Sequence, residues 1–100
     1  MPNKHYISGR NREYAVMREL EKLGYLCIRS AGSHSTADVI AFLWKDGLEL
    51  PLIRFIQVKN GNSPYKKELE IMRNMKLPNN VSKEIWIFKN RTKQIIEVKE

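Results

Sequence analysis

The stretch LIRFIQVK at residues 52–59 constrains the fold more than any other part of this sequence. It is rich in β-branched and aromatic residues, which predicts a largely buried strand. Two of its polar residues, Gln57 and Lys59, lie two positions apart, and because strand side chains alternate between faces, they lie on one face. The breaker cluster NGNSP follows at residues 60–64, and then a helical pattern begins. Since a strand-helix-strand connection needs a crossover, we expect a sheet with helices packed on it.

The other elements follow from hydrophobic periodicity and turn signals. An amphipathic helix is predicted at residues 10–23, with Ser8 as its N-cap and Gly24 just past its end. A second helix is expected to begin with Ser63 as N-cap and Pro64 at its first position. Further strands are predicted at residues 25–29, 38–44, 84–88 and 94–98. The fold class is therefore α/β, a mixed central β-sheet flanked by helices in the order αβββαββ, with the second and third strands forming a hairpin.

Size and charge limit the classes of function. One hundred residues predict a single domain, 1–100, and the 42% apolar content is typical of a folded chain. Eighteen Lys and Arg against eleven Asp and Glu give a net charge of +7, which favours a nucleic-acid partner, although solubility alone also explains a basic chain. Cys27 is the only cysteine, which excludes an internal disulfide and a cysteine-based zinc site. With no apolar leader or membrane-length segment, we expect a soluble, cytoplasmic protein without membrane contact.

Polar residues at strand positions indicate the chemistry. An amide and an ammonium on the half-buried face of Gln57 and Lys59 need partners, and a carboxylate from the neighbouring strand, Asp38, together with a metal ion would supply them. Such oxygen ligands suit Mg²⁺, with Mn²⁺ as the alternative. Glu13 near the start of the first helix would add a carboxylate or hold a metal-bound water. Beside the ion, Lys59 is suited to stabilise a phosphoryl transition state, so the set predicts phosphodiester hydrolysis.

These residues, in this order, resemble the PD-(D/E)xK nuclease superfamily, most closely the archaeal-type Holliday junction resolvases. The resemblance covers residues 9–62 and rests on Glu13, the serine-rich loop SAGSHSTADVIAF that contains Asp38, and the motif Gln57-Val58-Lys59. It implies a restriction-endonuclease-like fold and an endodeoxyribonuclease that cleaves branched DNA. It also implies a homodimer that places two active sites on opposite strands of a four-way junction.

The same resemblance implies a role for each motif residue. Asp38 would be the principal metal ligand, Gln57 a ligand through its side-chain oxygen and Val58 a ligand through its backbone carbonyl. Lys59 would be the catalytic lysine, and Glu13 would complete the metal site. Because Gln57 stands where a glutamate is commoner, a dipole replaces a full charge, and we expect weaker metal binding.

DNA contacts are expected around this site. By the resemblance, Ser30 or Ser33 would contact the scissile phosphate, while Ala37 departs from the proline that often precedes the aspartate. The remaining candidate phosphate contacts are Arg10, Arg12, His34, Lys66 and Lys67. Each of the four Arg and Lys residues is equally well explained as part of a solvated surface, and His34 as a solvent contact.

Other interpretations stand beside these. Asp38 alone fits a turn or cap aspartate, Gln-x-Lys arises by chance on edge strands, and Glu13 fits a first-turn carboxylate that favours the helix dipole. The aromatic residues at strand positions are predicted to be core rather than base-stacking platforms: Trp44, Phe55, Trp86 and Phe88. Alternative functions are a nuclease of the same superfamily that cuts duplex or flap DNA, of viral replication-repair or restriction type, and a degenerate, non-catalytic DNA-binding module.

Overall fold

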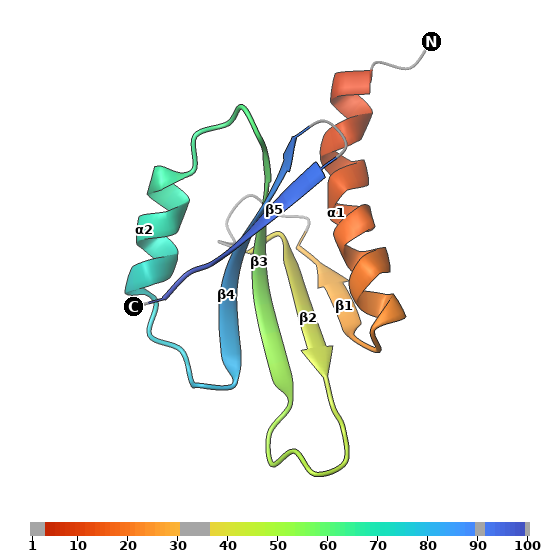
Figure 1. The fold of residues 1–100 in the computed structure, drawn as a ribbon, viewed down its shortest axis with the longest axis vertical. Helices are drawn as coiled ribbons and strands as arrows, with labels where there is room; N and C mark the ends of the chain where they lie inside the picture. Colours follow the sequence, from red (N-terminus) through yellow and green to blue (C-terminus); the bar gives the residue numbers. More distant parts are fainter. Residues whose placement is uncertain (1–3, 31–36, 90–91, 100) are drawn as a thin grey trace.

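The computed structural model describes residues 4–30, 37–89 and 92–99, and the side chains from residue 11 onward within these ranges. Seven elements follow one another along the chain (Figure 1). They are α1 (Lys4–Lys22), β1 (Leu26–Arg29), β2 (Val39–Leu43), β3 (Leu52–Asn60), α2 (Lys66–Asn74), β4 (Val81–Lys89) and β5 (Thr92–Glu97).

The strands form one five-stranded sheet in the order β1-β2-β3-β4-β5. The β3–β4 pair is parallel and the other three pairs are antiparallel, so the sheet is mixed. Strands β2 and β3 form the predicted hairpin, and α2 lies in the crossover that makes β3 and β4 parallel. The predicted α/β class with a mixed central sheet is confirmed.

Each face of the sheet has its own core and its own helix. On one face, Val16 and Leu20 of α1 pack with the buried strand residues Val39, Ile56 and Trp86. On the other, α2 contributes a second buried cluster that contains Met72, Ile85, Ile87 and Val98. The two helices lie on opposite sides of the sheet in Figure 1. Strand β3 therefore sends alternate side chains into two different environments.

The helix ends differ from the sequence prediction in two places. Helix α1 begins at Lys4, so Ser8 lies inside it and is not its N-cap. Helix α2 begins at Lys66 with Tyr65 at the N-cap, because the NGNSP segment forms a turn in which the Ser63 N–H donates to the Asn60 carbonyl at 2.9 Å. The predicted end of the first helix is confirmed: Gly24 follows α1 with φ +98°, a conformation that favours glycine.

The aromatic residues divide between core and surface. Trp86 is 1% exposed, and Phe55 and Phe88 pack against the two clusters, as predicted. Trp44 is 61% exposed, so its assignment to the core was wrong: it follows the end of β2, beyond the part of the sheet that the helices cover. None of the helices that the structure describes is long and apolar enough to cross a membrane.

Candidate active site

The side chain of Asp38 lies directly against the Gln57-Val58-Lys59 motif. The Asp38 N–H donates to the Ile56 carbonyl at 2.9 Å, which extends the β2–β3 ladder by one bond beyond the last paired residues, Val39 and Ile56. Past this point Val58 has no backbone partner on β2, and Asp38 Oδ2 instead accepts its N–H at 2.9 Å. The same oxygen accepts from Gln57 Nε2 at 3.0 Å. Because the backbone pairing between β2 and β3 ends here, the Asp38 carboxylate contacts the Gln57-Val58-Lys59 motif, as predicted.

Lys59 and Gln57 share the face of β3 that is turned toward α2. Val58 and Ile56 pack in the hydrophobic cluster that contains Val16 and Leu20 of α1. Because side chains alternate along a strand, Gln57 and Lys59 lie on the other face of the sheet. Lys59 Nζ contacts Glu68 Oε1 of α2 at 3.0 Å, with both side chains about one-quarter exposed or less. This ion pair fixes the ammonium group of Lys59 between β3 and α2.

Sequence reasoning did not select Glu68, although a signal for it exists. Glu68 lies three residues after Tyr65 and four before Met72, and both of these pack in the α2-side core. Side chains at these spacings share one face of a helix. A carboxylate within the inward stripe of the second helix, close to the strand that carries Lys59, was therefore recognisable.

Glu13 lies near this cluster but is held by another group. Its carboxylate accepts from Arg29 Nη1 at 3.0 Å, and the Arg29 guanidinium also lies 5.2 Å from the centre of the Tyr14 ring. Arg29 was not predicted. Its position two residues after Cys27, which packs toward α1, was the available signal that its side chain meets the first helix.

The electrostatic setting of Asp38 is unfavourable to its own charge. Burial raises the pKa of the Asp38 carboxyl, the Val58 N–H acts in the opposite direction, and nearby Glu13 raises the pKa again. Lys59 lowers this pKa and Glu68 raises it. Burial is the largest effect, and the pKa of Asp38 is raised overall. The pKa of Glu68 is lowered, chiefly by its hydrogen bond from Lys59. Asp38 is therefore a desolvated carboxylate that lies close to two others, and additional positive charge would stabilise it.

The donors around Asp38 fit a hard cation. The predicted ligands, which are carboxylate, amide and backbone carbonyl oxygens, are those that Mg²⁺ prefers. Because the N–H and C=O of one strand residue point to the same side, the Val58 carbonyl also faces the edge where Asp38 lies. Gln57 turns its amide nitrogen toward Asp38, so binding through its oxygen requires the amide to rotate. Within the described residues, no three His, Cys, Asp or Glu side chains form a ready-made metal cage.

Comparisons with models of protein families, with curated proteins and with solved structures found no match for this chain. Of the predicted site, Asp38 contacts Gln57 and Val58 directly, while the adjacent Lys59 pairs with Glu68. Glu13 acts on Asp38 through space while it contacts Arg29.

The predicted DNA contacts are only partly described. Lys66 and Lys67 are exposed in the first turn of α2, immediately before Glu68. Arg12 is half-buried on α1, and the Ser30 N–H donates to the Asp38 carbonyl at 2.8 Å, which ties this serine to the site. Ser33, His34 and the side chain of Arg10 lie outside the described residues.

A buried carboxylate, Glu84, lies on the opposite face of the sheet from Asp38 and was not predicted. Glu84 of β4 is 5% exposed and accepts from Arg54 Nε at 2.8 Å and from Arg54 Nη2 at 2.7 Å. Ser82 Oγ and Trp86 Nε1 also donate to it, at 2.7 and 2.9 Å. Burial alone would raise the pKa of Glu84, but these donors outweigh it and hold the pKa below its usual value.

Proposed function

We propose that this chain is a metal-dependent DNA endonuclease with a restriction-endonuclease-like fold that cleaves phosphodiester bonds in branched DNA, as archaeal-type Holliday junction resolvases do. The observation that carries the proposal is the contact between Asp38, directly before β2, and the Gln57-Val58-Lys59 motif of β3. A carboxylate without a cationic partner among the described residues, beside an ordered lysine, suits metal-assisted phosphodiester hydrolysis. The net charge of +7 favours a polyanionic substrate.

Each residue of the cluster has a task in this function. Asp38, with the oxygens of Gln57 and Val58, would hold a divalent cation, which supplies charge neutralisation and water activation when bound. Lys59 donates to a non-bridging or attacking oxygen, and Glu68 keeps its ammonium group aimed into the site. Arg29 holds Glu13 at the border of the cluster, where its carboxylate positions water.

Cleavage assays test this function directly. Purified protein is incubated with a four-way junction, a flapped duplex and a linear duplex of matched length, with Mg²⁺ or Mn²⁺. The proposal predicts paired nicks near the branch point, lost in Asp38→Asn and Lys59→Ala and kept in Asp46→Asn, whose carboxylate is exposed in the β2–β3 connection. Equal cleavage of junction and linear duplex would assign the site to the duplex-cutting or flap-cutting alternative.

The non-catalytic module is the rival from another class, and the state of Gln57 favours it, because an amide already hydrogen-bonded to Asp38 brings no charge to a metal. Under that alternative, no DNA form is cut with either metal. DNA affinity then survives Asp38→Asn and Lys59→Ala and falls steeply with salt concentration.

A homodimer is part of the proposed function, and the sheet offers a surface for it. Leu26 and Ile28 of β1 are 67% and 51% exposed on the face away from α1, since Cys27 between them packs toward that helix. The register extends this surface across the sheet to three half-buried residues, Ile40, Phe42 and Ile53. Helix α2 covers the other end of this face and leaves these side chains to solvent.

The size of this surface fits a second copy of the chain. These five side chains with exposed Trp44 present on the order of 500 Å² of apolar area, at the upper end for a monomer. A standard interface takes about 800 Å² from each partner, of which about 65% is apolar in homodimers. Sedimentation equilibrium should show a dimer that Ile28→Ser weakens and that Ile71→Ser, an equally apolar change at an exposed position of α2, leaves intact. A monomer at every concentration would contradict the dimer.

A further inference from the structure

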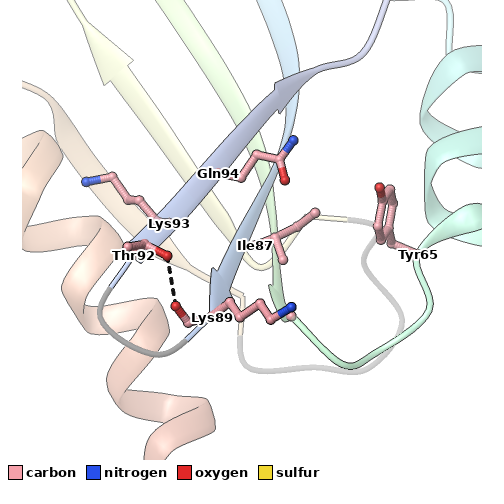
Figure 2. Close-up of a pocket in the computed structure, with 7 residues that line it drawn as sticks. Tyr65, Ile87, Lys89, Thr92, Lys93 and Gln94 are labelled. Carbon is pink, nitrogen blue, oxygen red and sulfur yellow. Dashed lines mark hydrogen bonds between the residues drawn. The ribbon is translucent and has the colours of Figure 1, made fainter.

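A cavity of about 300 Å³ lies where the turn after β3, the start of α2 and the β4–β5 hairpin meet (Figure 2). Its lining combines an aromatic ring, an amide, an ammonium group and an apolar floor. The residues that contribute are Gly61, Tyr65, Ile87, Lys89, Thr92 and Gln94, with Lys93 at the margin. None of these residues belongs to the site described above, so the cavity needs its own explanation.

The cavity opens on the same face of the sheet as Lys59. Lys59 pairs with Ile87 across β3 and β4, and Ile87 pairs with Gln94 across β4 and β5, so these three side chains form one row on one face. Neighbouring strands lie about 4.8 Å apart, which puts Gln94 about 10 Å from Lys59. That span equals the axial rise of about three nucleotides of a DNA strand. A strand held at Lys59 therefore reaches the cavity.

Lys89 is the cation that the cavity holds in place. A Cβ on Gly61 would lie 2.7 Å from Lys89 Cβ and 3.0 Å from its Cγ, so only glycine lets the stem of Lys89 lie against the chain here. The Gly61 N–H also donates to the Phe88 carbonyl at 2.7 Å, which keeps the two segments together. Across the part of the chain that the structure describes, Lys89 pairs with no carboxylate. The stem of Lys89 is thus held against Gly61, and its ammonium group is not neutralised by a carboxylate of the described residues.

The neighbouring side chains complement this charge. Lys93 points away from the cavity in Figure 2, because its ammonium group pairs with Glu19 and lies 5.6 Å from the centre of the Trp86 ring. Tyr65 and Gln94 face the cavity with a ring and an exposed amide that both donates and accepts. Ile87, only 7% exposed, forms an apolar floor between them.

We propose that this cavity binds one unpaired nucleotide of the DNA strand that enters the Asp38–Lys59 site. Lys89 contacts its phosphate, Tyr65 stacks on its base and Gln94 hydrogen-bonds the edge of the base, the combination by which proteins hold unstacked nucleotides. This assignment rests on the proposed function, and it adds a specificity for DNA with unpaired residues close to the cleavage point. The volume suits a ligand of about one nucleotide.

Binding measurements without cleavage test the cavity separately from the nuclease. A fluorescent single-stranded tetranucleotide is titrated in Ca²⁺ or without metal, at several salt concentrations. We expect Lys89→Gln to weaken binding about fivefold to tenfold and to reduce the slope of log K against log salt by about 0.7, one phosphate contact. Lys45→Gln, the same charge change at an exposed position of the β2–β3 connection, should change neither quantity. If Lys89→Gln and Lys45→Gln weaken binding equally, the loss is explained by net charge alone and the proposal is wrong.

The close approach of Gly61 provides an internal control. Gly61→Ala displaces the Lys89 stem and should weaken binding as Lys89→Gln does, with no further loss when the two are combined. Amide NMR adds a direct readout: thymidine 5′-monophosphate should shift the Gly61 and Gln94 signals, and inorganic phosphate should shift Gly61 alone. Additive losses, or identical shifts with both ligands, would contradict the assigned nucleotide. If the cavity binds the tetranucleotide as expected but the protein cleaves no DNA, the proposed nuclease function is wrong and the proposed nucleotide-binding cavity stands.

Discussion

Asp38, which directly precedes β2, and Glu84 of β4 are carboxylates on opposite faces of the sheet, the first half-buried and the second buried, and their surroundings differ. Glu84 accepts four hydrogen bonds, two of them from the guanidinium of Arg54, and its pKa is held below the usual value. Asp38 accepts two hydrogen bonds from neutral amides, and burial raises its pKa. The Arg54 guanidinium also lies 5.4 and 5.8 Å from the ring centres of Tyr25 and Trp86, which encloses the Glu84 pair further.

The difference separates a structural carboxylate from one that is ready for an external cation. The charge of Glu84 is neutralised by the chain itself, so the pair holds two strands together. Asp38 contacts no cationic side chain among the described residues. The ammonium group of nearby Lys59 forms an ion pair with Glu68 instead. Replacing each carboxylate with its amide should therefore have opposite effects on stability, and only Asp38 should matter for catalysis.

The largest effect is expected for Asp38→Asn on cleavage. The variant keeps an oxygen that accepts both hydrogen bonds but loses the charge that holds a metal, so the rate of DNA cleavage should fall about a thousandfold, about 4 kcal/mol. Single-turnover cleavage of a four-way junction measures it, with Asp46→Asn as the control. A rate within threefold of the unchanged protein would show that Asp38 is not the metal ligand.

Glu84→Gln should cost about 3 kcal/mol of unfolding free energy, because it leaves the half-buried Arg54 guanidinium without its counter-charge. Urea denaturation followed by tryptophan fluorescence gives this value. The control is Glu97→Gln, since Glu97 pairs with Glu84 in register across β4 and β5 but is exposed. Equal stability of the two variants would contradict the structural role of Glu84.

The pH dependence of stability follows from the lowered pKa of Glu84. Since the folded-state pKa lies below the unfolded value near 4.5, the stabilisation is complete above that pH and is lost as the pH falls through the folded pKa. The difference in unfolding free energy between the unchanged protein and Glu84→Gln should be constant from pH 6 to 8 and shrink on acidification below the unfolded value near 4.5. A difference that is independent of pH would assign the loss to packing.

A smaller change is expected for Glu68→Gln. The amide no longer pairs with the Lys59 ammonium group, so Lys59 is less well aimed and the cleavage rate should fall about tenfold, as for other positioning contacts. Rescue by Glu68→Asp, with kcat rather than KM as the affected quantity, would distinguish positioning from substrate binding. Glu70→Gln, on the exposed side of the same helix, is the control. An unchanged kcat would remove Glu68 from the site.

The sequence was sufficient where the relevant contacts follow from local periodicity. The two-residue alternation of β3 and the hairpin to β2 are local features, and together they place Asp38, Gln57 and Lys59 within reach. The pairs Arg29–Glu13 and Arg54–Glu84 join residues 16 and 30 positions apart, and they depend on how α1 and β4 dock. Glu68 depends on the packing of α2, and the start of that helix was displaced by the turn at residues 60–64.

Thermal unfolding with and without Mg²⁺ tests most directly the central claim that Asp38 binds a divalent cation. Without metal, Asp38→Asn should raise the stability by up to about 1 kcal/mol, because it removes an uncompensated charge. With Mg²⁺ at ten times its Kd, the unchanged protein should gain about 1.4 kcal/mol, roughly 6–11 °C in Tm, while Asp38→Asn should gain none. An equal rise of Tm in both proteins, or a rise in neither, would contradict the account.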